Sequence, residues 1–125
     1  SCVESCTALE CDLHPASERE CYAVMAKDDI RMQSSSGGVF TVLAQYVLKK
    51  DGLVCGAAWN PEWTVSHKII SSEEQLDELR RSKYVASQTD HTFTQIKKAL
   101  DTGKMVLFSG CPCQVAGLQK LFNTI

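Results

Sequence analysis

Cys111 and Cys113 are the residues of this sequence best suited to chemistry, because they lie together in a predicted turn between a strand and a helix. The apolar run 105–108 predicts the strand, and the apolar spacing of residues 115–122 predicts the helix, with Pro112 in its first turn. The N-terminus of a helix favours negative charge, and the thiolate is the form of cysteine that binds metals and attacks disulfides. The pair could therefore ligate a metal or cluster or act as redox thiols, although two partly buried structural cysteines would give the same pattern.

Length and composition place the chain among ordinary globular domains. It has 125 residues, of which 44% are hydrophobic and 22% charged, and this is enough for one domain with a normal core. The formal net charge of −2 gives no reason to expect nucleic acid or an anionic membrane as a partner. No apolar run is as long as a membrane span and no signal-peptide pattern opens the chain, so we expect a cytoplasmic protein.

Seven cysteines are many for this length, and an odd number fits a closed disulfide framework poorly. We therefore expect some of them to serve a metal, a cluster or redox chemistry, with an intermolecular disulfide as the alternative. Cys2, Cys6 and Cys11 fall in residues 1–20, which are predicted to form a leader separate from a domain over 21–125. Their spacing is not that of a bacterial ferredoxin, so a cluster or zinc site there competes with a leader whose thiols have no role.

A serine- and glycine-rich segment is the second candidate site. Three serines and two glycines, residues 34–38, precede a helix predicted over 39–50, and Gly52 follows its end. The serines could cap this helix, or the glycines could let unpaired N–H groups approach a phosphate or another anion. The predicted apolar face of the helix consists of Val39, Phe40, Leu43, Tyr46 and Val47.

The remaining pattern predicts an α/β fold, with a mixed sheet of about four strands and helices packed on its faces. The predicted strands are 21–27, 53–59, 64–70 and 105–108, and the turn at 60–62 makes 53–70 an antiparallel hairpin. Further helices are predicted over 73–81, which buries Leu76 and Leu79, and over 92–100. The buried side of the second is expected to hold Phe93, Ile96 and Leu100, while His67 on the hairpin is expected to face solvent.

A basic segment, residues 80–87, is the third candidate site. Cations suit the C-terminus of a helix, so the segment could simply end the helix over 73–81. Alternatively it is a clamp, with Lys83 on an anionic cofactor and Tyr84 stacking nearby.

Four motifs occur in an order that is specific to one family: residues 34–38, 52–58, 81–85 and 110–118. With them the chain resembles the N-terminal part of the beta subunits of coenzyme F420-reducing hydrogenases and related dehydrogenases, over about 21–122. The resemblance implies an iron–sulfur flavoprotein that passes electrons between a [4Fe-4S] cluster, FAD and a partner such as coenzyme F420. A redox partner protein or a ferredoxin-like module is the expected donor or acceptor.

The resemblance also assigns roles to residues. It implies that Cys113 is a cluster ligand and that Lys83 places positive charge beside the flavin, stabilising its reduced anionic form. The residues expected to lie against the flavin are Ser35, Ser36, Gly37 and Gly38, to which the clamp adds Tyr84.

The sequence also departs from the family. Cys111 is an extra thiol where the family usually has threonine, and the leader cysteines do not match the ferredoxin module that often precedes this domain. Family members continue past the point corresponding to Ile125, so we expect a part of a longer protein. Two other functions stay open: a cofactor-free structural or interaction domain, and a thiol-redox or zinc module using Cys111 and Cys113.

Overall fold

The computed structural model describes residues 20–123 of the chain. The segment Val24–Ser109 forms one compact unit, and the chain from Gly110 onward belongs to a second unit. The first unit contains the sheet and all but one of the described helices. The second contains helix α5, Pro112–Asn123, which begins at the proline that the sequence predicted for its first turn.

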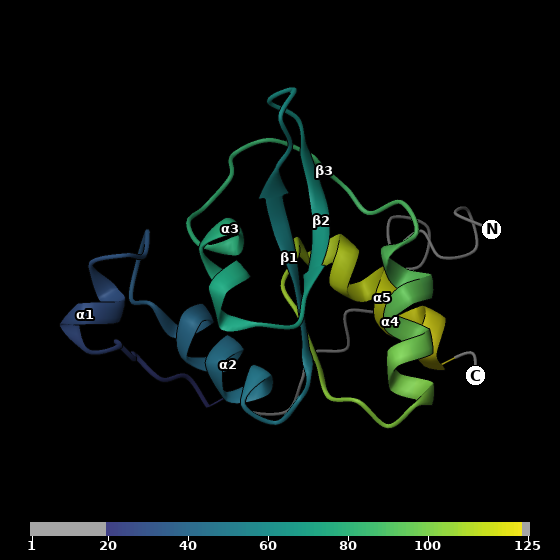
Figure 1. Cartoon of the computed structure of the whole chain (residues 1–125), viewed down its shortest axis with the longest axis horizontal. Coiled ribbons are helices and arrows are strands. Elements are labelled where there is room, and N and C mark those ends of the chain that lie inside the picture. The colour runs from purple at the N-terminus through teal and green to yellow at the C-terminus, as the bar shows by residue number, and fades with distance from the viewer. Residues whose placement is uncertain (1–19, 124–125) are drawn as a thin grey trace. The chain divides into compact units, whose positions relative to one another are not determined.

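The first unit is built on a mixed four-stranded sheet, as predicted (Figure 1). The central strands β1, Leu53–Trp59, and β2, Val65–Ile70, form the predicted antiparallel hairpin, with Val54 opposite Ile70. Strand β4, Val106–Phe108, pairs parallel to β1, and strand β3, Ser87–Gln88, pairs parallel to β2. The sheet is therefore mixed. The order of the strands across the sheet is β3-β2-β1-β4.

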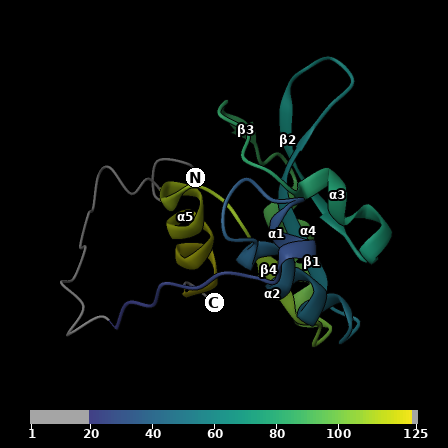
Figure 2. The ribbon, with the colours of Figure 1, turned by 90° about the vertical axis from the view of Figure 1, so that its left-hand side faces the viewer.

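Helices cover both faces of this sheet (Figures 1 and 2). Helices α2, Val39–Leu48, and α3, Leu76–Leu79, lie on one face, where they meet β1 and β2 in the main core. Helix α4, Thr92–Asp101, lies on the other face. This unit also contains the short helix α1, Asp28–Arg31, and the 3-10 turn η1, Glu73–Gln75, which leads into α3. Because both faces are covered, β1 is buried along most of its length.

The core under α2 corrects one expected face. Leu43 and Tyr46 are 48% and 54% exposed, whereas Thr41 and Ala44 are buried. Nearly every residue of α2 is apolar, so several stripes at helical spacing compete, and the stripe with small side chains faces the sheet. The core cluster consists of Ala44, Val47, Leu48, Val54, Ala58, Ile70, Leu76 and Leu79.

The segment 21–27 is not a strand, and β3 takes its place in the count of four. Its larger side chains, Tyr22, Val24 and Met25, are all more than 60% exposed, so their alternation reflects no buried face. The predicted helix over 73–81 consists of the 3-10 turn η1 followed by α3. It ends two residues earlier than predicted, because Arg80 has an extended backbone. On α4, Ile96 is buried as expected but Leu100 is 41% exposed.

His67 does not face solvent, as the sequence suggested, but is buried with an exposed fraction of 8%. Its ring stacks on Phe108 of β4, with 5.1 Å between the ring centroids. Nδ1 lies 2.7 Å from Ser87 Oγ and Nε2 lies 3.0 Å from the carbonyl oxygen of Ser109. The expectation failed because α4 covers the face of the hairpin on which His67 lies, and Thr92 of α4 donates to the His67 carbonyl.

Burial of His67 predicts a pH dependence of stability. Burial lowers the pKa of the imidazole below its ordinary 6.5, although the bond to the Ser109 carbonyl acts in the opposite direction. The unfolded chain therefore binds more protons than the folded one between the two pKa values. The free energy of unfolding should fall as the pH drops below about 6.5, by up to about 1.4 kcal/mol per pH unit. Urea titrations from pH 7.5 to 5 should show this slope in the wild type and a shallower one in His67→Asn; equal slopes would contradict it.

Candidate functional site

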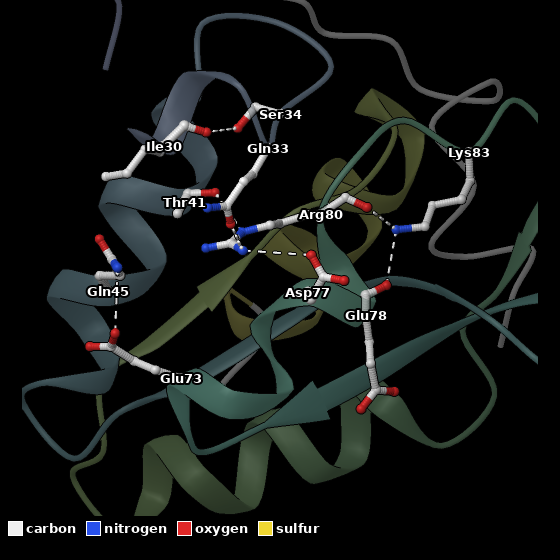
Figure 3. Close-up of polar contacts among 10 residues, drawn as sticks. All are labelled: Ile30, Gln33, Ser34, Thr41, Gln45, Glu73, Asp77, Glu78, Arg80 and Lys83. Carbon is white, nitrogen blue, oxygen red and sulfur yellow. Dashed lines mark hydrogen bonds and ion pairs between the residues drawn. The ribbon is translucent and has the colours of Figure 1, made fainter. Parts of the chain in front are cut away.

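The serine- and glycine-rich segment lies at the N-terminus of α2. Gly38 is the N-cap residue and has a left-handed backbone with φ of 79°, a conformation that favours glycine. No side chain of the described residues caps this helix, and its N-cap is Gly38, so the serine cap considered from the sequence is wrong. Ser34 instead donates its hydroxyl to the carbonyl of Ile30 in α1, at 2.9 Å (Figure 3). The N–H groups that open α2 therefore have no side-chain acceptor.

Both glycines of the segment also lie close to the chain that precedes them. A Cβ at Gly37 would lie 3.0 Å from the carbonyl oxygen of Val24. A Cβ at Gly38 would lie 3.1 Å from both Ala26 Cβ and Ile30 Cγ2. The N–H of Ala26 donates to the Gly37 carbonyl at 2.7 Å, which holds the preceding chain against the segment. The glycines thus fix the position of the α2 N-terminus.

The basic segment is joined directly to the serine-rich one. The backbone N–H of Ser82 donates to Ser35 Oγ at 2.9 Å, although the two residues are 47 positions apart in the sequence. The structure therefore brings together two of the three sites that the sequence singled out. Cys113, the third, belongs to the other unit.

Arg80 is the polar centre of this junction and was missed from the sequence (Figure 3). Its side chain is 14% exposed, and Nε donates to Thr41 Oγ1 in α2 at 3.4 Å. Nη1 donates to the Gln33 side chain and lies 3.6 Å from an Asp77 carboxylate oxygen. Since Gln33 precedes the serine-rich segment, Arg80 ties the end of α3 to the chain that enters α2. Arg80 and Arg81 are adjacent, and no local pattern indicates which of the two arginines turns inward.

Lys83 caps the C-terminus of α3 (Figure 3). Its ammonium donates to the carbonyl of Arg80 at 2.6 Å and to that of Glu78 at 3.1 Å. Burial lowers the pKa of Lys83, and the nearby Asp77 carboxylate opposes that shift. An ammonium has three donors, so one more acceptor can be bound. The neighbouring Tyr84 is 93% exposed and presents its whole ring to a ligand or partner.

A hollow with a volume of about 370 Å³ adjoins these residues. Its lining consists of Trp59, Asp77, Glu78, Arg80, Arg81, Ser82 and Lys83. Both acids in the lining are paired with a cation, Asp77 with Arg80 and Glu78 with Lys68. The two remaining cations of the lining give it an excess of positive charge, which favours an anionic ligand.

Of the four cysteines within residues 20–123, Cys55 is buried and the other three are exposed. Cys55 on β1 is fully buried, and burial raises the pKa of its thiol to about 12, which keeps it unreactive. Cys111 and Cys113 are both exposed at the start of α5, and the Cys111 N–H donates to Gln114 Oε1 at 2.9 Å. Within residues 20–123, no group of three or more His, Cys, Asp or Glu side chains is placed to hold a metal ion.

A [4Fe-4S] cluster requires four cysteine ligands, so the described residues do not make a complete cluster site. The exposed Cys113 can serve as one ligand, and the others would have to come from elsewhere. Cys2, Cys6 and Cys11, whose roles the sequence left open, lie outside the described residues. No described helix is long and apolar enough to cross a membrane.

Comparison with known proteins confirms the family resemblance over residues 21–92. Residues 21–92 match the family described as coenzyme F420 hydrogenase/dehydrogenase, beta subunit N-term. The match includes the serine- and glycine-rich segment and the basic segment with Lys83 and Tyr84, and it ends before Cys113. No curated protein matches the chain. The match extends over more than half of the sequence, and the chain therefore belongs to the coenzyme F420 hydrogenase/dehydrogenase beta-subunit family, through its N-terminal domain.

Proposed function

We propose that this chain is the flavin-binding part of an electron-transfer oxidoreductase, with FAD bound at the junction of the serine-rich and basic segments. The observation that carries the proposal is the hydrogen bond from the Ser82 N–H to Ser35 Oγ, which joins the two segments into one site. Family membership supports an oxidoreductase related to coenzyme F420 hydrogenases and dehydrogenases.

The parts of this site suit the groups of FAD. The N–H groups at the start of α2, after Ser36, Gly37 and Gly38, have no side-chain cap from the part of the chain that the structure describes, and they favour the pyrophosphate. The ammonium of Lys83 adds positive charge with one donor to spare, and the exposed ring of Tyr84 can stack on an aromatic ligand. The excess of positive charge in the adjoining hollow also favours binding of the anionic pyrophosphate.

Cys113 is the proposed ligand that this chain supplies to a [4Fe-4S] cluster. When bound, FAD exchanges electrons singly or in pairs, so it can link an iron–sulfur centre to a two-electron acceptor such as coenzyme F420. A redox partner protein or a ferredoxin-like module would supply or take up the single electrons, in a cytoplasmic setting. The residues of the chain hold and orient these groups.

Titration of the protein with FAD tests the proposal. The wild type should bind FAD saturably, and Lys83→Gln, which removes the charge but keeps N–H donors for the α3 carbonyls, should raise Kd about tenfold. Lys97→Gln is the matched control, because Lys97 lies on α4 and pairs with Asp101. Absence of saturable binding would contradict the proposal and favour a cofactor-free domain. An equal effect of the two substitutions would remove Lys83 from the site.

A further inference from the structure

His67 is a buried polar group that the proposed site does not use. It lies on β2, the strand that shares the centre of the sheet with β1. Its two ring nitrogens contact two different segments, Ser87 at the start of β3 and Ser109 just after β4. No buried side-chain nitrogen or oxygen among the described residues lacks a hydrogen-bond partner, so both nitrogens of this ring are satisfied.

The partners fix the protonation of the ring. A carbonyl oxygen can only accept a hydrogen bond, so we assign the proton to Nε2, which donates to Ser109. In the neutral ring Nδ1 is then an acceptor, and the Ser87 hydroxyl donates to it. Each nitrogen therefore serves one segment, and the two bonds can be removed separately.

Both bonds lie where the strand pairing of these segments ends. Strand β3 has two residues, and its register with β2 is limited to Val65 with Ser87 and Ser66 with Gln88. Strand β4 has three residues, and beyond it the Ser109 N–H donates to the Cys55 carbonyl at 2.9 Å. The ring of His67, on β2, thus adds one hydrogen bond to each of the two segments beside their strand pairing.

In the sequence, these two segments are next to the candidate cofactor residues. Ser87 follows Lys83 and Tyr84 by a few residues, and Ser109 is the last residue before Gly110-Cys111-Pro112-Cys113. We propose that His67 is a positioning residue, which holds the basic segment through Ser87 and the end of β4 through Ser109. The second half of this inference, that the held segments serve cofactors, rests on the proposed function.

Two conservative substitutions separate the bonds. In His67→Asn the amide reaches the place of Nδ1 and keeps the bond to Ser87, and in His67→Gln it reaches the place of Nε2 and keeps the bond to Ser109. Amide hydrogen exchange, followed peptide by peptide, should therefore rise about tenfold at Ser87–Gln88 only in His67→Gln. It should rise by a similar factor at Ser109 only in His67→Asn. Thr92→Val, which removes the bond to the His67 carbonyl and leaves the ring in place, should change neither segment selectively.

FAD affinity provides the second measurement. His67→Gln, which releases the basic segment, should raise the Kd for FAD about tenfold, while His67→Asn should leave it near the wild-type value. Exchange that rises equally in both segments of both variants would overturn the positioning role, because it would report only a general loss of stability. Segment-specific exchange in a protein that binds no FAD would support the positioning role and remove the proposed function. Segment-specific exchange with unchanged FAD affinity in both variants would overturn the link between His67 and the flavin.

Discussion

Replacing Gly52 with alanine is expected to lower the free energy of unfolding by about 3 kcal/mol. Gly52 connects α2 to β1 in the chain, and in space it lies against Val47 of α2 and Met105, the residue before β4. A Cβ there would be 2.6 Å from Val47 Cγ1, 2.7 Å from the Met105 carbonyl oxygen and 2.8 Å from that of Val47. Two of these atoms are backbone, so the helix and the strand would have to move apart. Urea unfolding followed by circular dichroism measures the loss.

Two other glycines are matched controls for this substitution. At Gly56 the nearest atom to a new Cβ is 3.6 Å away, so Gly56→Ala should be tolerated. At Gly103 nothing lies within 4 Å, but φ is 78°, so Gly103→Ala should lower stability by about 1 kcal/mol through backbone strain alone. Equal losses for Gly52→Ala and Gly103→Ala would show that crowding at Gly52 is not the cause.

Replacing Cys113 with serine is expected to remove the iron and the broad visible absorbance of an iron–sulfur cluster from the protein. Serine has nearly the same shape but is a poor ligand for iron, and thiolates hold such clusters. Because Cys113 is exposed, the substitution should leave the thermal unfolding of the cluster-free protein unchanged, so loss of the cluster would not reflect loss of the fold.

Cys111→Ser is the control, since Cys111 is also exposed and lies two residues away in the same turn. It should retain the iron and the spectrum of the wild type. Retention of the spectrum in Cys113→Ser would remove Cys113 as a ligand. Loss in both variants would show that the cluster depends on both thiols.

The elements with strong periodicity could be predicted from the sequence. The hairpin of β1 and β2, helices α2, α4 and α5 and the short strand β4 follow from apolar patterns and turn residues. Strand β3 could not be found, because two residues carry no period, and it is defined only by its pairing with β2. The alternation in 21–27 failed for the opposite reason, since a pattern without a partner strand makes no sheet.

The sequence pointed to the parts of the candidate site but not to the contacts between them. The motifs pointed to residues 34–38 and to Lys83, but not to the bond between Ser35 and Ser82 that brings these segments together. Nor did alternation along the hairpin identify His67 as buried, because it does not say whether a helix covers the second face. Such contacts join residues far apart in the chain, and local patterns contain no information about them.

The measurement that tests the central claim most directly is the cofactor content of the protein purified without oxygen. We predict flavin absorbance bands in proportion to protein, together with iron, sulfide and the broad absorbance of an iron–sulfur cluster. Released flavin should be identified as FAD by chromatography, and a sample depleted of flavin should take up added FAD again. A colourless protein that contains no iron and takes up no FAD would contradict the account.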